Sequence, residues 1–414
     1  MKKLSQKKYF LIIISLILFS NHIQAQNGWI LKTHIPPTPP RSQPTASVVD
    51  GKIYVIGGMT TGFVDVADNY SYDPLTDNWD SLAPMPTPRS FATSAVVNGI
   101  IYVIGGGYPT VTNKNEAYDP ATDTWTVKAN LPGPPRLAMR ADVIDGIIYV
   151  VGGNYFQNDC YAYDPSTDTW NILAPIPVPN GGGALSVTAY NGLIYTFGGS
   201  NYPPWVAFSY VFAYNPQTNT WDTTTLTPMP TARFGLYTYL VGDTIYAVGG
   251  SQSEGTALAK VETYYPLTDT WGSKPDMPNA YAWFAGAVAY NKIYVIAGTL
   301  DWNTSDYSVW EYDILVGVEE ELIHPSNFIL EQNYPNPFNP STKISWQLSE
   351  GSNVTLKIFN TIGEEVVTLV NNEYQNAGEH SSLFIVNSTI PSGVYFYQLK
   401  AGDYINTKKM LLLK

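Results

Sequence analysis

Residues 101–125 read IYVIGGGYPTVTNKNEAYDPATDTW and contain three landmarks in a fixed order. An aliphatic stretch carries Tyr102 and ends in the glycine pair at residues 105–106. Tyr118-Asp119-Pro120 follows, and Trp125 comes seven residues after Tyr118. Short apolar runs bounded by glycine, proline and aspartate are typical of β-strands joined by turns. This stretch therefore predicts strands separated by tight turns.

The same landmarks recur along the chain. The first glycine position lies at 57, 105, 152, 198, 249 and 297, with alanine at 297, so the spacings are 48, 47, 46, 51 and 48 residues. The matching tryptophans are Trp79, Trp125, Trp170, Trp221 and Trp271. The sixth repeat stops after Asp313 without a tryptophan, whereas Trp29 stands near the N-terminus. Repetition at a fixed period predicts an array of equivalent units.

Each repeat has the residues for four antiparallel strands. Asn98-Gly99 and Asp145-Gly146 suit two-residue hairpin turns, because both positions tolerate positive φ. The glycine pair marks a place where the chain turns sharply or passes close to a neighbour. Asp119-Pro120 suits the turn before the last strand, which carries the tryptophan.

The repeats resemble the kelch motif over residues 27–313, and this resemblance implies a β-propeller. Six glycine landmarks and six tryptophans, counting Trp29, imply six four-stranded blades. The strand of Trp29 would complete the blade begun by residues 281–313, which removes a free sheet edge. An open array or two separate sandwiches is the alternative, but neither explains the offset of Trp29. The predicted fold class is all-β, with a six-bladed kelch propeller over residues 26–317.

The composition restricts the class of protein. The 414 residues are 14% charged and 14% aromatic, which argues against a disordered chain. The net charge of −12 argues against a nucleic-acid partner. The single cysteine, Cys160, is expected to be a small core residue. With only four histidines, we expect no metal site, and we expect no cofactor.

The N-terminus has the pattern of a secretory signal peptide over residues 1–25. Four lysines precede an apolar run at residues 9–19, which is too short to span a bilayer. A buried hydrophobic helix is the alternative interpretation. No later stretch is long and apolar enough to be a transmembrane segment, so we expect an exported protein.

The C-terminal residues 328–414 follow a predicted linker at 318–327 and contain short alternating strands, which indicate a small Ig-like β-sandwich. The opening NYPNPFNP at 333–340, the stretch PSGVYFY at 391–397 and Lys408-Lys409-Met410 resemble the type A sorting domain of type IX secretion substrates. The resemblance implies that the secretion machinery is a partner through residues 328–414. It also implies passage through the periplasm to the cell surface or the medium. An ordinary ligand-binding sandwich is the alternative.

Candidate ligand-binding residues gather in the variable connections, which propeller geometry places on one face. Exposed aromatic rings and arginines on a rigid scaffold suit a sugar or a protein partner. The candidates are Arg89, Arg136, Arg233, Tyr108, Tyr155, Trp205, Trp283 and Trp302. The alternative is that the aromatic side chains pack loop against loop and that the arginines lock blades by bonding to carbonyls. Arginine does not recur in every repeat, because Asn180 and Tyr281 take its place in two of them.

The sequence favours a non-enzymatic protein that binds a glycan or a protein partner. A carbohydrate-active propeller, either a sialic-acid mutarotase-like isomerase or a hydrolase, is the alternative. Its acid and base groups could come from Glu116, Asp159, Glu254 or Asp306. A structural surface protein without a ligand is a third class. Some kelch propellers are copper radical oxidases, but the propeller segment contains only His34, which argues against that chemistry.

Overall fold

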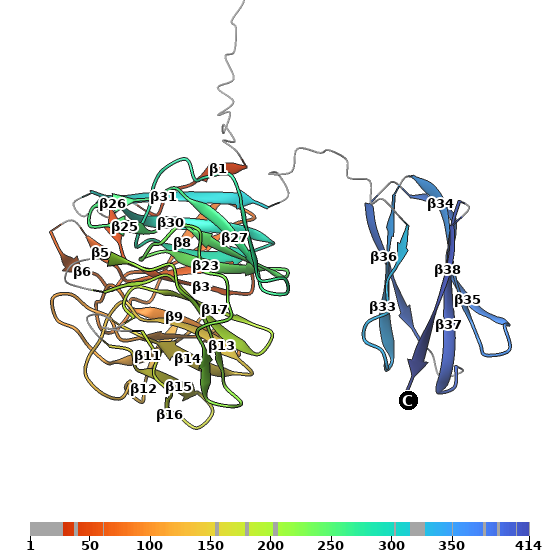
Figure 1. The fold of residues 1–414 in the computed structure, drawn as a ribbon, viewed down its shortest axis with the longest axis horizontal. Helices are drawn as coiled ribbons and strands as arrows, with labels where there is room; N and C mark the ends of the chain where they lie inside the picture. Colours follow the sequence, from red (N-terminus) through yellow and green to blue (C-terminus); the bar gives the residue numbers. More distant parts are fainter. Residues whose placement is uncertain are drawn as a thin grey trace, which may run out of the picture. The chain divides into compact units, whose positions relative to one another are not determined.

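The computed structural model describes residues 28–36, 40–60, 62–153, 157–178, 182–201, 206–301, 304–314, 328–349, 351–375, 378–386, 390–402 and 404–413. The described residues form two compact units, 28–314 and 328–413 (Figure 1). Their regular structure consists of strands, and no helix among them is long and apolar enough to cross a membrane. The predicted leader (1–25) and linker (318–327) lie outside the described residues.

The first unit contains six four-stranded antiparallel sheets, which we number as blades 1 to 6. From the axis outward they are β3 (Thr45–Val49), β4 (Lys52–Ile56), β7 (Asn69–Asp73) and β8 (Asn78–Leu82); β9 (Thr93–Val97), β10 (Ile100–Ile104), β11 (Asn115–Asp119) and β12 (Thr124–Lys128); β13 (Arg140–Ile144), β14 (Ile147–Val151), β15 (Cys160–Asp164) and β16 (Thr169–Leu173); β17 (Ser186–Tyr190), β18 (Leu193–Phe197), β21 (Val211–Asn215) and β22 (Thr220–Asp222); β23 (Tyr237–Val241), β24 (Thr244–Val248), β27 (Val261–Tyr265) and β28 (Thr270–Ser273); and β29 (Ala285–Ala289), β30 (Lys292–Asp301), β31 (Thr304–Asp313) and β1 (Trp29–Lys32).

The six blades close into a ring. Each innermost strand contacts the innermost strand of the next blade, and β29 contacts β3. Strand β1 from the N-terminus pairs with β31 near the C-terminal end of the unit, with Trp29 opposite Tyr312. The predicted six-bladed propeller is therefore confirmed, and an open array is excluded.

Close backbone approach between blades explains the glycine pairs. Gly105 has a φ of 59°, and a Cβ atom placed on it would lie 2.8 Å from the carbonyl oxygen of Arg136 in the next blade. The next glycine, Gly106, donates its N–H to that same carbonyl at 2.9 Å. A side chain at position 105 would separate the two blades, so glycine is required by packing as well as by backbone conformation.

Tyrosine, aspartate and tryptophan form a latch between neighbouring blades. In blade 2, the Tyr118 hydroxyl and the Ala83 N–H both donate to Oδ1 of Asp123, at 2.7 and 2.8 Å, and the Trp125 indole N–H donates to the Ala83 carbonyl at 2.9 Å. Because Ala83 belongs to the end of blade 1, these bonds join the two blades. Equivalent latches are made by Tyr72, Asp77 and Trp79 with Thr33; by Tyr163, Asp168 and Trp170 with Ala129; by Tyr214, Asn219 and Trp221 with Ala174; and by Tyr264, Asp269 and Trp271 with Thr227.

The latch at blade 6 differs from the other five. The Trp29 indole N–H reaches the carbonyl of Pro275 in blade 5 at 3.4 Å. The buried Tyr312 hydroxyl has no hydrogen-bond partner among the described residues, because the blade ends at Asp313 before the latch carboxylate could follow. Stacking of Trp29 on Tyr312, with ring centroids 4.8 Å apart, remains.

The second unit is a two-sheet sandwich (Figure 1). Strands β32 (Ile329–Leu330), β33 (Ser341–Leu348) and β36 (Gly378–Ile385) form one sheet, and β35 (Glu365–Gln375), β34 (Ser352–Phe359), β37 (Gly393–Ala401) and β38 (Tyr404–Leu412) form the other. Both sheets contribute to one core, with Trp346 on one side and Tyr397 on the other. The Tyr397 hydroxyl accepts the N–H of Asn333 at 2.8 Å, which ties the proline-rich opening to the sandwich.

The latches predict how acid destabilises the propeller. Hydrogen bonds from Tyr118 and from the Ala83 amide hold the pKa of Asp123 below its usual value, and a hydrogen bond from Tyr163 does the same for Asp168. Because these pKa values are lower in the folded state, their stabilisation is present above the unfolded-state pKa of about 3.9 and is lost as pH falls through the folded-state pKa. The variant Asp123→Asn/Asp168→Asn should therefore lose less stability than the wild type below about pH 4.

Urea denaturation at a series of pH values measures this difference. Asn219 already serves as an amide latch in blade 4, so asparagine fits the site. The matched control Asn219→Asp adds a fifth carboxylate latch and should steepen the acid limb. Parallel pH profiles for all three proteins would contradict the assignment.

Candidate functional site

The connections between the second and third strands build a crown on one end of the propeller. We call the connections between the second and third strands of all six blades the crown. In four blades they form or extend hairpins: β5 (Met59–Thr60) with β6 (Val64–Asp65), β19 (Ser200–Asn201) with β20 (Val206–Ala207), β25 (Ser251–Ser253) with β26 (Thr256–Ala257), and the outer halves of β30 and β31. Neighbouring hairpins touch, because β20 contacts β25 and β26 contacts β30. The short strand β2 (Arg41–Ser42) pairs with β5 and contacts β30 and β31, which continues the crown from blade 6 to blade 1.

A ring of backbone hydrogen bonds forms the floor of the crown. Its members have positive φ and lie two residues before the innermost strands: Gln43, Phe91, Ala138, Ala184, Gly235 and Trp283. The N–H groups of Gln43, Phe91, Ala138, Gly235 and Trp283 donate to the carbonyls of Trp283, Gln43, Phe91, Ala184 and Gly235, respectively, at 2.8–3.1 Å. These bonds connect the segments that lead into the six innermost strands and hold them at the same level along the propeller axis.

The sequence analysis missed this ring. Its members share no side-chain type, and the only signal is that each lies fourteen residues before the first glycine position of its repeat. Backbone bonds of this kind leave no requirement on the side chain beyond tolerance of positive φ, so motif reading cannot detect them.

Trp283 fills the centre of this floor. Its side chain is only 3% exposed and packs edge-to-face on Phe91 at 5.4 Å, with Phe234 at 6.1 Å. A Cβ atom on Gly235 would lie 2.9 Å from the Trp283 ring, so the indole occupies the space that a side chain would take. The structure therefore gives Trp283 a packing role, which was the alternative to ligand binding for the aromatic candidates.

The three candidate arginines are also buried. Arg89, Arg136 and Arg233 are at most 1% exposed, and each pairs with a carboxylate of the same blade, namely Glu116 at 3.0 Å, Asp159 at 3.1 Å and Glu262 at 3.1 Å. Arg89 and Arg233 also donate to the carbonyls of Val103 and Ala247. Burial lowers the pKa of Arg89 to about 10, so its guanidinium stays charged at neutral pH. These side-chain contacts all lie within one blade, so each arginine fastens the segment before an innermost strand to its own blade.

The arginine position is filled differently in two blades. Tyr281 occupies it in blade 6, as the sequence predicts, and its hydroxyl donates to Asp306. In blade 4 the sequence analysis assigned Asn180, but the backbone geometry assigns Gly182, because a Cβ atom on Gly152 would lie 2.5 Å from the Gly182 carbonyl. Gly182 lies sixteen residues before the first glycine position of its repeat, as Arg89 and Arg233 do in theirs, whereas Asn180 lies outside the described residues.

Three of the four predicted acid and base groups are bound to other side chains of the propeller. Glu116 is 1% exposed and bound to Arg89, Asp159 is bound to Arg136, and Asp306 accepts from Tyr281. Burial raises the pKa of the Cys160 thiol to about 12, which fits a core residue. Among the residues that the structure describes, no three His, Cys, Asp or Glu side chains are grouped as a metal site.

One exposed apolar cluster lies on the crown, over blades 1 and 2. Phe63, Val64 and Tyr108 are 53%, 58% and 41% exposed, and the two rings lie 6.0 Å apart. Asp65 accepts the N–H groups of Tyr108 at 2.7 Å and Ser90 at 3.1 Å, so it holds the two connections together. Of the candidate residues, Tyr108 is therefore exposed on the crown, whereas Tyr155, Trp205 and Trp302 lie outside the described residues.

The family model described as KLHDC2/KLHL20/DRC7 Kelch-repeats domain matches residues 14–199 and 139–316. The chain belongs to the kelch-repeat family. Residues 332–413 match a second family model, the secretion system C-terminal sorting domain. The C-terminal unit of this kelch protein is thus a sorting domain, which indicates export by a secretion system.

Curated relatives match parts of the kelch protein. N-acetylneuraminate epimerase 1 of Escherichia coli O6:H1 is 48% identical over 54 residues, which are 12% of this chain and 14% of the relative. Beta-scruin of Limulus polyphemus is 30% identical over 119 residues (25% and 13%), and a kelch domain-containing protein of Sulfurisphaera tokodaii is 31% identical over 115 residues (28% and 15%). The matched segments thus span 13–15% of these relatives.

A solved structure has the same propeller fold. The structure of YjhT aligns with a TM-score of 0.58 at 18% identity, and the alignment covers 67% of this chain and 95% of that one. At this identity the likeness shows the fold alone.

The buried arginines predict a large stability effect in the kelch propeller. Replacing Glu116 by Gln should cost about 3–5 kcal/mol of unfolding free energy, because it leaves the Arg89 charge buried without compensation. Denaturant unfolding measures the loss. Glu254→Gln, at an exposed crown position, is the matched control and should change little. An unchanged stability for Glu116→Gln would contradict the structural role of Arg89 within its blade.

Proposed function

We propose that this exported kelch propeller binds a glycan or a protein partner through its crown. The exposed pair of Phe63 and Tyr108 on a rigidly held face carries the proposal. A leader at residues 1–25 would direct the chain across the inner membrane, and the sorting domain would direct it across the outer membrane to the surface or the medium.

The contrast between constant and variable parts supports binding at the crown. Glycine pairs and latches repeat from blade to blade, whereas the crown connections differ in length and structure; in blade 2, residues 107–114 contain no strand. Recognition residues on a scaffold concentrate in connections that can vary without disturbing the core. Backbone bonds from Gly107 to Ser90 and from Ser251 to Phe234, together with Asp65, hold the bases of these connections, which lowers the entropy cost of binding a partner.

The chemistry of the exposed cluster supports a partner with apolar surface and polar groups. Phe63 and Val64 present apolar area, and Tyr108 adds a hydroxyl to its ring. Aromatic side chains of this kind give large contact area and dominate binding energy in protein interfaces, and they also stack on sugar rings.

A sugar isomerase is the second candidate function, because a 54-residue segment is 48% identical to N-acetylneuraminate epimerase 1. The carboxylates bound to Arg89 and Arg136 are engaged in ion pairs, which disfavours them as acid and base groups. Proton NMR of N-acetylneuraminate anomers with the purified protein tests this candidate, since an isomerase would accelerate their interconversion.

Truncation of the crown rings should abolish binding. In a glycan array and a cell-surface protein screen with the chain lacking residues 1–25, Phe63→Ala/Tyr108→Ala should weaken the partner found with the parent protein by about tenfold or more. Leu75→Ala/Leu267→Ala is the matched control, because both leucines are 71% exposed in turns at the opposite end of the blades. Equal binding by all three proteins would refute the crown as the binding face.

Removal of the sorting domain should stop export. Deleting residues 328–414 should leave the propeller in the periplasm of a bacterium with a type IX system, because the secretion machinery would lack the domain that it reads. Cell fractionation measures its location, and protease resistance of the retained propeller separates lost export from misfolding. Normal delivery to the surface would contradict the sorting role.

A further inference from the structure

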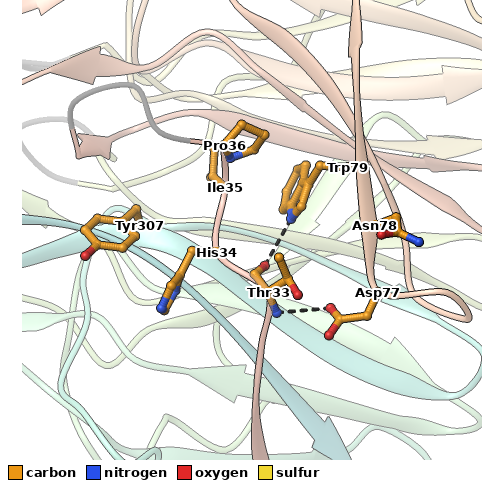
Figure 2. Close-up of a pocket in the computed structure, with 8 residues that line it drawn as sticks. All are labelled: Thr33, His34, Ile35, Pro36, Asp77, Asn78, Trp79 and Tyr307. Carbon is orange, nitrogen blue, oxygen red and sulfur yellow. Dashed lines mark hydrogen bonds between the residues drawn. The ribbon is translucent and has the colours of Figure 1, made fainter.

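A groove lies at the rim of the propeller, at the seam where the last blade meets the first (Figure 2). It has a volume of about 650 Å³ and is lined by Thr33, His34, Ile35, Pro36, Asp77, Asn78, Trp79 and Tyr307. The segment 33–36 follows β1 of blade 6, residues 77–79 belong to the last turn and outer strand of blade 1, and Tyr307 lies in β31. We call it the seam groove.

Part of the seam groove is the ordinary latch. The Thr33 N–H donates to Oδ1 of Asp77 at 3.0 Å, and the Trp79 indole N–H donates to the Thr33 carbonyl at 3.0 Å, as the dashed lines in Figure 2 show. Equivalent bonds occur at four other seams, so these residues alone do not distinguish this one.

His34 and Tyr307 do distinguish it. The bond from the Ile35 N–H to the Tyr307 carbonyl, at 3.2 Å, has a counterpart in every other blade, and these counterparts define the equivalent positions. Positions equivalent to Tyr307 hold small residues, namely Ala67, Asn113, Asn158, Ser209 and Ala259. Positions equivalent to His34 hold Pro84, Asn130, Pro175, Pro228 and Asp276. At this seam both positions hold an aromatic side chain, His34 and Tyr307, whereas at the other five seams both positions hold non-aromatic residues.

The two substitutions create an aromatic wall. The His34 and Tyr307 rings meet edge-to-face with centroids 4.8 Å apart, and Tyr307 is 44% exposed. Figure 2 places His34 and Trp79 on either side of Thr33, with Tyr307 beyond His34. The latch bond holds the Trp79 indole in one orientation, so binding would cost little side-chain entropy there.

The polar atoms at the edge are mainly acceptors. Asp77 receives both latch bonds, from Tyr72 and Thr33, on Oδ1, so its second oxygen takes part in neither of them. Exposed Asn78 donates one amide hydrogen to Thr76, and its side-chain oxygen adds an acceptor. Ring faces beside carboxylate and amide groups match a pyranose, which has an apolar C–H face and donates through its hydroxyls.

We propose that the seam groove binds a pyranose ring of a glycan, with Trp79, His34 and Tyr307 as the aromatic wall and with Asp77 and Asn78 accepting hydroxyl hydrogens. A proline-rich peptide could not use the Trp79 N–H as a donor, because that N–H is already bonded to Thr33. Tyr307 belongs to the crown part of β31, but the groove does not include Phe63 or Tyr108 and does not rest on the proposal for that cluster.

Saturation-transfer NMR with the chain lacking residues 1–25 tests the proposal, using the methyl glycosides of glucose, galactose, mannose and N-acetylglucosamine as probes. At least one probe should bind the parent protein, and His34→Pro/Tyr307→Ala should weaken it by about tenfold or more. That variant installs the residues found at the next seam, Pro84 and Ala67, so the fold should tolerate it. Asp77→Asn keeps a latch acceptor, as Asn219 does, and should also weaken binding.

Two results would overturn the seam groove as a sugar site. One is that none of the four probes binds, and the other is that His34→Pro/Tyr307→Ala binds as the parent does. Phe63→Ala/Tyr108→Ala separates this proposal from the crown. It should leave probe binding unchanged, and loss of binding in that variant would assign the sugar to the crown instead.

Discussion

The indole N–H of one blade donates to a backbone carbonyl at the end of the preceding blade, and the propeller depends on this bond. Between blades 1 and 2, the Ala83 carbonyl accepts a hydrogen bond from Trp125, and the Ala83 N–H donates one to Asp123. The Asp123 carboxylate also accepts a hydrogen bond from Tyr118. Each latch therefore satisfies backbone groups at a strand end, where no further strand is available to pair with them. Neighbouring blades that met only through face-to-face contacts could slide past one another. The directional hydrogen bonds of the latches fix the rotation of each blade relative to the next.

The blade that closes the ring combines two distant parts of the chain, and both of its seams depart from the repeat. Towards blade 5, Tyr312 lacks a latch carboxylate, and the ring contact with Trp29 and the Trp29 bond to Pro275 remain. Towards blade 1, the latch is complete and His34 and Tyr307 add an aromatic wall beside it. The two seams of the closing blade therefore need not follow the repeat, because one strand of this blade, β1, comes from the N-terminal end of the chain.

Burial separates structural from exposed residues around the axis. The arginines, the carboxylates that pair with them and Trp283 are all chemically suited to ligands, yet they are used to hold blade entrances together. Among the aromatic residues of the crown and the rim, Phe63, Tyr108 and Tyr307 stay exposed. A repeat scaffold can present such residues because its core is complete without them.

The sequence by itself determined the blade number, the strand order within a blade, the closing role of Trp29 and the sorting domain, because these depend on local turn chemistry and on spacing. It also identified Cys160 as a core residue. Only the tertiary structure decided which polar and aromatic side chains are buried. Arg89 and Trp283 look the same in sequence whether they face solvent or a neighbouring blade, and their burial depends on contacts with Glu116, Phe91 and Gly235. The floor ring and the seam groove could also be recognised only in the tertiary structure, since they join backbone and side chains from repeats that are distant in the chain.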